Sequence, residues 1–332
     1  DLIEELARIY SYDERPSVSP MARMTINRGN RLLEQVKTAR EVLINRDYQE
    51  VITYSFIDPK TSSLLKNKEK SMMLANPIAP ELSEMSPSLW PGLIHALQYN
   101  MKRQQSRLRL FESGLVFSGS DDLKQDYHVG GLIYGNKFEK QWGINYSLSD
   151  FYDIKQDLET CLSALGSTTE FEPEPAGLDC LHPGQSLKIS LNGNPVVYMG
   201  QLHPAISREL DLDRELYLFE IFIENLTDKQ AIKYQPISKF PSIKRDISIV
   251  IDNAIPFKEV ESSVKNSATE LLNNLELFDV YRGEGIEKGK KSLALGLTFQ
   301  ATSSTLKDEE VESIMEGIVD ELHNNFGAKL RE

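Results

Sequence analysis

The sequence has no long apolar run. No run of about 18 apolar residues occurs, which excludes a membrane-spanning helix. Asp1, Glu4 and Glu5 stand where a secretory signal would need cations and an apolar stretch, so no signal peptide is expected. Cysteine is equally scarce, with only Cys161 and Cys180 in 332 residues. Two thiols in a chain of this length favour a reducing, cytoplasmic setting over a disulfide.

Positive charge is also in deficit. The chain has 37 Lys and Arg against 50 Asp and Glu, for a formal net charge of −13. This balance argues against non-specific binding of nucleic acid by the whole surface, although it leaves room for one local basic patch. The length predicts about two domains of roughly 150 residues each. A composition of 40% hydrophobic and 26% charged residues is typical of a globular protein with real cores.

The first two thirds of the chain have the pattern of an α+β domain. Leu2, Leu6 and Ile9 lie at helical spacing, and no N-cap precedes Asp1. Residues 1–16 are therefore predicted to be the end of a helix, followed by a turn, and the sequence is expected to begin inside that helix. Further helices are expected over 30–46, 89–103, 151–165 and 204–210, and strands over 50–57, 72–75, 107–117, 129–134, 186–191, 196–202 and 216–223. This pattern predicts an antiparallel sheet with helices packed on it.

The pattern changes at residue 238. A strand over 246–252 is followed by a helix that opens at Pro256, then by two strands, and then by a helix that ends at Gly327. Thr305 and Asp308 form a predicted capping box for this last helix. Residues 328–331 can supply a final strand. The order β-α-β-β-α-β predicts a ferredoxin-like domain, with four antiparallel strands and two helices on one face.

The loop between the two central strands, residues 282–291, carries three glycines and four cations. In the strand that follows, residues 292–300, leucine and phenylalanine alternate with small or polar residues. A period of two indicates one face in a core and one bare face. A phosphate-binding P-loop is excluded, because Glu284 occupies the first glycine position and the loop joins two strands. A bare sheet face beside a basic loop predicts a docking surface.

Several long stretches resemble one family in the order in which they occur. FPSIKRDISIVID, ELFDVYRGEGIEKGKKSLALGLTFQ and TLKDEEVESIMEGIVDEL are similar to the anticodon-binding domain of the bacterial-type phenylalanyl-tRNA synthetase (phenylalanine–tRNA ligase) β subunit. RGNRLLEQVKTAREVL, YQEVITYSFIDP, SLWPGLIHALQYNMKRQQSRLRLFESGLVF, LHPGQSLKI and YMGQLHP resemble the synthetase-like core of that subunit. The opening DLIEELARIYSYD resembles the last helix of the domain before that core.

The resemblance implies three segments and a C-terminal fragment. Residues 1–16 would be the end of the preceding domain, 17–237 a catalytically inactive class II aminoacyl-tRNA synthetase-like core, and 238–332 a ferredoxin-fold anticodon-binding domain. The editing domain and the N-terminal tRNA-binding module of the family would lie before Asp1.

The resemblance also implies a role within a ligase. In the family, the α subunit forms phenylalanyl-adenylate from ATP and charges tRNA-Phe, while the β subunit supports it in a cytoplasmic α2β2 heterotetramer. The residues agree with a core that has no catalytic site of its own. The strand 107–117 lacks the Phe-Arg-x-Glu pattern of motif 2, and Ser86 stands where many relatives carry arginine. No Gly-x-Gly-x-Gly followed by arginine occurs near 216–225, although transfer needs cations against developing charge.

A magnesium site is implied by the same resemblance. The family motif Asp-x-x-Glu-Glu, described as holding Mg²⁺ shared with the α subunit, corresponds here to Asp1, Glu4 and Glu5. Residues four apart share a helix face, and carboxylate oxygens suit this cation. The alternative is a solvated acidic first turn favoured by the helix dipole. A further upstream aspartate of the pattern is missing.

Six cations are predicted to contact tRNA phosphates. Residues 239–332 hold 12 Lys and Arg against 17 Asp and Glu, and seven of these acids lie on the second helix, which leaves the cations on another side. Tyr281 is the only ring expected near the bare face, so base stacking should be more limited than in an RNA-recognition motif. The predicted contacts are Lys244, Arg245, Arg282, Lys288, Lys290 and Lys291.

Two other groups of residues have competing interpretations. His182, His203 and the two cysteines match no zinc spacing, so the histidines are interpreted as turn residues with hydrogen-bonded rings. Leu32, Val36, Ala39 and Leu43 form a helical stripe that could be plain core or part of the subunit interface, and the resemblance favours the interface.

Two other functions stay open beside the scaffold of a ligase. One is a stand-alone RNA-binding or interaction module of the same fold. The other is an independent class II-like ligase, which the missing motifs disfavour.

Overall fold

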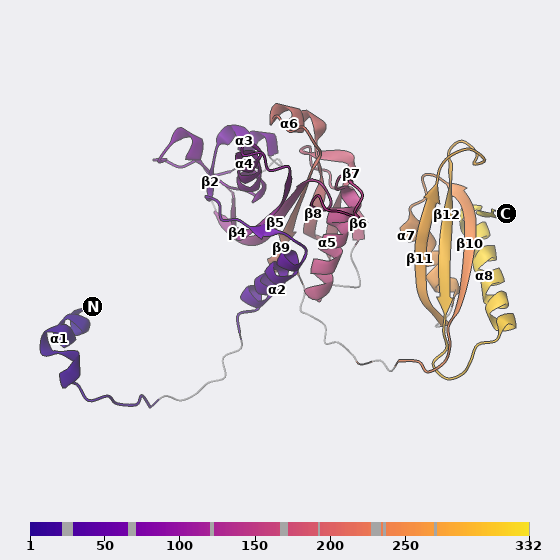
Figure 1. The fold of residues 1–332 in the computed structure, drawn as a ribbon, viewed down its shortest axis with the longest axis horizontal. Coiled ribbons are helices and arrows are strands. Elements are labelled where there is room, and N and C mark those ends of the chain that lie inside the picture. The colour runs from indigo at the N-terminus through magenta and orange to yellow at the C-terminus, as the bar shows by residue number, and fades with distance from the viewer. Residues whose placement is uncertain are drawn as a thin grey trace. The chain divides into compact units, whose positions relative to one another are not determined.

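The computed structural model describes residues 1–21, 29–65, 71–119, 123–166, 172–191, 193–226, 234, 237–268 and 271–331. The chain divides into two compact units, Asp1–Ala231 and Ile232–Glu332 (Figure 1). None of the helices in the described ranges combines the length and the apolar character that crossing a bilayer requires.

The first residues form a helix, as predicted. α1 spans Leu2–Tyr10 and is followed by a 3-10 turn at Tyr12–Glu14. Ala7 is its only buried residue, while Leu2, Leu6 and Ile9 are exposed.

The first unit is built on a seven-stranded sheet. Its strand order is β1-β4-β5-β9-β8-β7-β6, and β1 pairs with β4 in parallel while every other neighbouring pair is antiparallel. The strands are β1 (Gln49–Glu50), β4 (Arg107–Ser118), β5 (Lys124–Gly135), β6 (Glu172–Glu174), β7 (Leu181–Leu191), β8 (Asn194–Leu202) and β9 (Leu216–Phe222).

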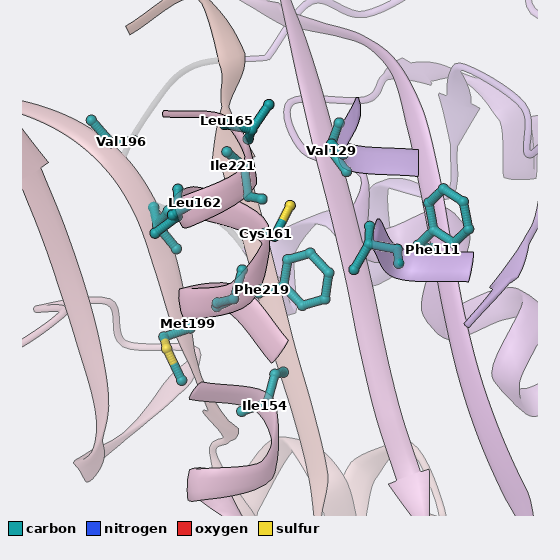
Figure 2. Close-up of a cluster of buried hydrophobic side chains, with 14 of the residues drawn as sticks. Phe111, Val129, Ile154, Cys161, Leu162, Leu165, Val196, Met199, Phe219 and Ile221 are labelled. Carbon is teal, nitrogen blue, oxygen red and sulfur yellow. The ribbon is translucent and has the colours of Figure 1, made fainter. Parts of the chain in front are cut away.

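One face of this sheet is covered by α2 (Arg31–Asn45) and α5 (Phe151–Ala164) (Figures 1 and 2). Phe111, Val129 and Phe219 point from the strands into this core. The stripe of α2 packs here too, since Val36 is 5% exposed and Ala39 and Leu43 are fully buried. The assignment of that stripe to a subunit interface is therefore wrong. The exposed apolar residues of α2 are Leu33 and Ile44.

The opposite face is covered by α4 (Trp90–Met101), with α3 (Pro59–Leu65) and α6 (Pro204–Glu209). Alternate residues of the same strands separate the two cores: Phe111 and Phe219 face α2 and α5, whereas Leu110 and Leu218 face α4. Side chains alternate along a strand, so a sheet with both faces covered needs apolar residues at nearly every position.

Part of the predicted structure around residues 50–57 is wrong. The strand stops at Glu50, and only Phe56–Ile57 (β2) pairs again, with Glu84–Met85 (β3). The reason is a side chain: Thr53 donates its backbone N–H to the Glu112 carboxylate at 2.7 Å, which takes the place of a strand partner. The predicted strand over 72–75 reduces to a single bridge between Met73 and Glu84.

The second unit has the predicted β-α-β-β-α-β order. The elements are β10 (Ile243–Asp252), α7 (Phe257–Ser267), β11 (Leu272–Tyr281), β12 (Lys290–Phe299), α8 (Asp308–Phe326) and β13 (Lys329–Leu330). The strands form an antiparallel sheet in the order β11-β12-β10-β13. Both helices pack on one face, over Ile249, Leu295 and Leu297 (Figure 1).

The predicted capping box of α8 is displaced. Thr305 lies before the helix, and the first turn is closed by Glu310, whose carboxylate accepts the backbone N–H of Lys307 at 3.1 Å. Gly327 ends α8 with a φ of 62°, a left-handed conformation that glycine adopts without strain.

Candidate RNA-binding surface

The open face of the four-stranded sheet is the face away from α7 and α8. In β10 and β12 the even-numbered residues lie on it, because the odd-numbered leucines and isoleucines enter the core. Ser248 pairs in register with Ala294, and Val250 with Ser292. These are the small side chains that the sequence predicted for a bare face.

The end of the open face next to the loop contains a ring, a guanidinium and two hydroxyls. The Ser248 and Ser292 hydroxyl oxygens lie 3.1 Å apart, and Ser292 is 3% exposed. The Arg331 guanidinium lies over the Tyr281 ring, 4.9 Å from its centroid. Arg331 follows β13 and Tyr281 ends β11, so the arginine reaches across two strands.

The Tyr281 ring is held by the loop that follows it. Its hydroxyl donates to the Glu284 carbonyl at 3.1 Å. A Cβ added at Gly283 would lie 2.6 Å from that hydroxyl, so only glycine leaves room for the ring in this position. The loop therefore fixes the orientation of the one ring predicted near the face.

Lys244 lies on the open face among acidic residues. Its ammonium is 3.8 Å from the Glu276 carboxylate. Its aliphatic stem passes over Gly296, where an added Cβ would lie 3.2 Å from Lys244 Cε and 3.3 Å from Asp246 Oδ1. The side chain is 58% exposed, so phosphate contact would compete with a solvated ion pair.

Arg245 and Lys291 do not belong to this face. Arg245 Nη2 lies 2.6 Å from the Asp308 carboxylate at the start of α8. Lys291 is 7% exposed and donates to the carbonyls of Asn253, at 3.2 Å, and Ile255, at 2.6 Å. Burial, followed by repulsion from Arg282, lowers its pKa. Neighbouring residues in a strand point to opposite faces, so each predicted pair of adjacent cations is divided between the two sides.

The loop 282–289 is exposed, and its turns are closed by its own backbone. Ile286 N–H donates to Gly283 O at 3.2 Å, and Gly285 and Gly289 have φ values of 86° and 88°. Within the described residues, Arg282 and Lys288 form no ion pair. Lys290 Nζ lies 2.5 Å from the Glu287 carboxylate, which lowers the pKa of Glu287.

The charges on the open face nearly balance. Lys244, Lys290, Lys329 and Arg331 face four acids at neighbouring register positions, Asp246, Asp252, Glu276 and Asp279. The prediction missed Lys329 and Arg331, which the alternation around Leu330 could have placed on the open face. It also missed Phe278, the extra residue at a β11 irregularity, which is 54% exposed.

Two groups of side chains in the first unit are not arranged as ligand sites. The Glu5 carboxylate pairs with Arg8 at 2.6 Å, and within the described ranges no three His, Cys, Asp or Glu residues converge to hold a metal. The Mg²⁺ predicted for Asp1, Glu4 and Glu5 remains an expectation from the resemblance. The rings of His182 and His203 accept backbone N–H groups two residues ahead, which confirms the predicted hydrogen-bonded rings, although His182 lies within β7 and His203 caps α6.

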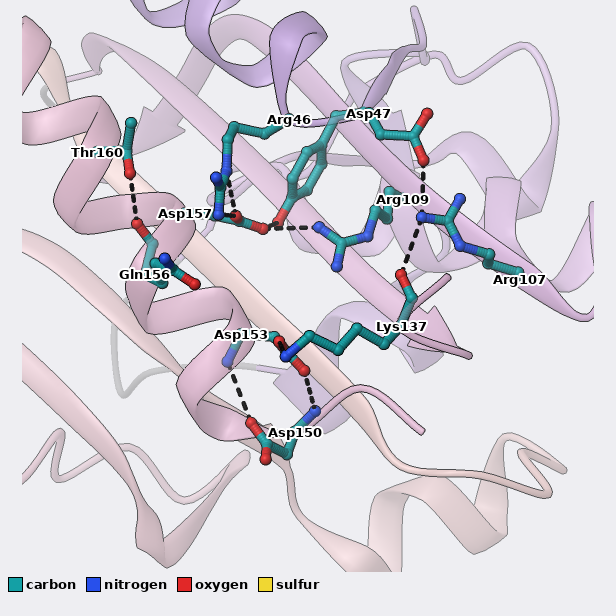
Figure 3. A network of polar contacts seen from close by, with 11 residues as sticks. Arg46, Asp47, Arg107, Arg109, Lys137, Asp150, Asp153, Gln156, Asp157 and Thr160 are labelled. Atoms are coloured by element: carbon teal, nitrogen blue, oxygen red, sulfur yellow. Dashed lines mark hydrogen bonds and ion pairs between the residues drawn. The ribbon is translucent and has the colours of Figure 1, made fainter. Parts of the chain in front are cut away.

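A buried carboxylate ties α2, β4 and α5 together (Figure 3). Asp157, with 2% of its side chain exposed, accepts from Arg46 Nε at 2.6 Å, Arg109 Nη1 at 2.7 Å and the Tyr48 hydroxyl at 3.0 Å. Arg107 pairs with Asp47 at 2.7 Å. The arginines of the motif 2-like strand are thus engaged in structural pairs on the α2 and α5 side of the sheet.

Comparison with known proteins covers both units. The family profile described as phenylalanyl tRNA synthetase beta chain CLM domain matches residues 16–223, and that of the ferredoxin-fold anticodon binding domain matches residues 238–331. The chain is 40% identical over 332 residues to the phenylalanine–tRNA ligase beta subunit of Pseudomonas savastanoi pv. phaseolicola. It is 41% identical, also over 332 residues, to that of Hahella chejuensis. All of this chain is covered in both cases, but only 42% of each relative.

The chain therefore spans about two fifths of the length of the curated relatives it matches. Among solved structures, a pyrrolysyl tRNA synthetase from Desulfitobacterium hafniense matches at 12% identity with a TM-score of 0.44, over 67% of this chain and 70% of that one.

Proposed function

This chain belongs to the phenylalanyl-tRNA synthetase β chain family, and on that premise we propose that its second unit binds the anticodon region of tRNA-Phe. The observation that supports this is the sheet face free of helices, with Tyr281, Arg331 and the Ser248–Ser292 pair at its end next to the loop. Aromatic rings, guanidinium planes and hydroxyls are the groups that bind unstacked RNA bases.

The contacts divide between bases and backbone. A flat base replaces, or inserts beneath, the Arg331 guanidinium on the Tyr281 ring, and the partly exposed Ser248 hydroxyl offers a hydrogen bond to its edge. Arg282 and Lys288, which form no ion pair within the described residues, and Lys290 at the rim contact phosphates. Because the charges on the face nearly balance, stacking contributes more than the sequence predicted.

The test is the affinity of a fluorescent tRNA-Phe anticodon stem-loop for the 332-residue chain. We expect Tyr281→Ala to weaken binding by about 1–3 kcal/mol, since stacking on the ring is lost. Tyr281→Phe is the matched control, because it keeps the ring and removes only the hydroxyl that bonds the Glu284 carbonyl. Wild-type affinity in the alanine variant would remove Tyr281 from the binding surface.

We also propose that the first unit is a non-catalytic scaffold for an α subunit that carries out ATP-dependent charging. On β4, the strand that resembles motif 2, Arg109 forms an ion pair with Asp157 and Arg107 forms one with Asp47. Beside them, Arg40 of α2 pairs with Glu50 of β1 at 2.6 Å, and the next residues expose apolar side chains, Ile52 at 94% and Tyr54 at 75%. Exposed apolar groups around an anchoring ring are typical of an interface centre.

Mixing the chain with purified α subunit tests this scaffold. We expect a complex by native mass measurement, and exchange of pyrophosphate with ATP only when α is present. Ile52→Asp with Tyr54→Asp should weaken the complex by about 2 kcal/mol or more, whereas Leu330→Asp, an exposed apolar site in the other unit, should leave it intact. Phenylalanine-dependent exchange by the chain alone would contradict the proposal.

A further inference from the structure

A cavity of about 210 Å³ lies on the α4 side of the seven-stranded sheet. It is bounded by the ends of α3 and α4 and by residues of β4, β5, β8 and β9. No part of the proposed function uses it.

Beside the cavity, α4 begins very close to the sheet. A Cβ added at Gly130 would lie 3.0 Å from Leu89 Cβ, so glycine allows this approach. The Leu89 backbone N–H then donates to Glu220 Oε1 at 3.1 Å, and His128 Nδ1 lies 2.9 Å from the same oxygen. Glu220 is 4% exposed and His128 is 5% exposed.

Each of these two buried side chains keeps one polar atom that no other described residue contacts. Glu220 Oε2 and His128 Nε2 have no protein partner there, although both residues line the cavity. Asp126 lies two residues before His128 on the same face of β5, also lines the cavity, and forms no ion pair within the described part of the chain. A carboxylate oxygen that has no hydrogen-bond partner in the protein can pair with a cation in the cavity that it lines.

The rest of the wall is mostly apolar or aromatic, with three serines, Ser62, Ser88 and Ser118. Trp90, Leu65 and Val116 contribute to it, and the Phe222 ring packs against His128 at 4.3 Å between centroids. The described lining contains two carboxylates, Asp126 and Glu220, and no Lys or Arg. A phosphate or carboxylate ligand would therefore be repelled by Asp126 and Glu220.

We propose that this cavity binds a small organic cation: a protonated amine on a ring-sized apolar body. The ammonium pairs with Glu220 Oε2 and Asp126, and the body packs against Trp90 and Val116. The volume suits such a ligand, since an apolar cavity of about 150 Å³ accepts benzene. The site is independent of RNA binding and differs in charge from an adenylate site, whose phosphate needs cations.

Benzylamine is the probe, and benzyl alcohol and benzoate are its neutral and anionic counterparts. For a ligand of this size we expect a dissociation constant on the order of 1 mM, measured by ligand-observed NMR with the 332-residue chain. Benzyl alcohol and benzoate should bind at least about tenfold more weakly, because neither supplies a cation to the carboxylates.

Substitutions of the two carboxylates test whether the amine binds in the cavity. Glu220→Gln should weaken benzylamine binding at least about tenfold. Asp126→Asn should weaken it too, and it serves as the second variant because Asp126 is only half-buried and makes no ion pair on which folding could depend. Glu224→Gln, an exposed carboxylate just beyond β9, is the charge-matched control and should leave binding unchanged.

Three results would overturn the proposal. One is no benzylamine binding at about 10 mM, a concentration well above the expected constant. Another is benzyl alcohol or benzoate binding as tightly as the amine. The third is unchanged amine binding in both Asp126→Asn and Glu220→Gln, which would mean an adventitious site elsewhere.

Discussion

The two sheets of this chain differ in how many faces are covered. Helices lie on both faces of the seven-stranded sheet, and its charged residues, such as Asp157 and Arg109, are buried with specific partners. The four-stranded sheet has helices on one face only, and its charges lie in the open, paired with exposed acids. Burial makes the first set structural, whereas exposure leaves the second set free to exchange partners with a ligand.

The same difference explains which predicted cations lie on the RNA-binding surface. In a sheet with one open face, a shift of one residue decides between core and solvent. Lys290 and Lys291 are neighbours in sequence, yet the first is at the open rim and the second bonds carbonyls before α7.

The largest expected effect on stability is in the seven-stranded sheet, which has helices on both faces. Asp157→Ala should lower the free energy of unfolding of the first unit by about 3–5 kcal/mol, because the guanidinium groups of Arg46 and Arg109 lose their buried partner. Both tryptophans, Trp90 and Trp142, lie in this unit, so their fluorescence during urea unfolding reports it.

Glu159→Ala is the control on the same helix. Its carboxylate is exposed and pairs with Lys155 one turn away, so the loss should stay below about 1 kcal/mol. Equal losses in the two variants would mean that burial of Asp157 contributes nothing beyond a surface pair.

The second prediction compares the two faces of β12. Leu295→Ala should lower the stability of the second unit by about 2–5 kcal/mol, since a fully buried side chain leaves a cavity. Thr298→Ala, on the open face, should cost about 0.5 kcal/mol. Circular dichroism during thermal unfolding measures both, and similar losses would show that the open face is packed as tightly as the core.

The third prediction separates two lysines of the basic stretch. Lys291→Met should destabilise the second unit by about 1–3 kcal/mol, because two carbonyls lose their donor. It should leave the salt dependence of RNA binding as it is. Lys288→Met should lower the salt slope by about 0.7 and leave stability unchanged.

Urea unfolding and stem-loop titrations over a range of salt concentrations measure the two quantities. A salt slope lowered by Lys291→Met and kept by Lys288→Met would reverse the assignment of these lysines.

The smallest effect is a pH dependence in the first unit. Glu112 is 7% exposed, and burial raises its pKa against the opposing hydrogen bonds from Thr53. As pH rises, the unfolded chain loses this proton first, at a carboxyl pKa of roughly 4.3, and the folded state loses it at a higher pH. Stability should fall as pH rises from the unfolded pKa through the folded pKa, and then level off.

Glu112→Gln removes this titration, so its stability relative to wild type should increase with pH across that window and stay constant above it. Urea unfolding at a series of pH values measures the difference. A relative stability that decreases with rising pH would reverse the sign of the pKa shift.

Periodicity alone predicted much of the fold. The alternation of Leu293, Leu295 and Leu297 with small residues gave the open face, and the β-α-β-β-α-β order followed from elements with strong patterns. Local capping was harder. The helix α3 was not among those predicted; it starts at Pro59, with Asp58 Oδ1 accepting the Lys60 N–H at 3.1 Å.

What the sequence could not predict depends on contacts between distant residues. Arg331 reaches a ring 50 positions earlier, and Thr53 bonds a carboxylate on another strand. The cavity beside α4 needs Gly130, Leu89 and Glu220 together. Such juxtapositions follow from sheet register, which no single stretch of sequence contains.

The most direct test of RNA binding by the open face uses methyl NMR of the 332-residue chain with labelled alanine and threonine. Ala294 and Thr298 lie on that face, while Ala268 and Ala328 are in the core beneath the helices. Adding the tRNA-Phe anticodon stem-loop should shift the Ala294 and Thr298 methyl signals and leave those of Ala268 and Ala328 in place. Saturable RNA binding that leaves the Ala294 and Thr298 methyl signals in place would contradict RNA binding by the open face.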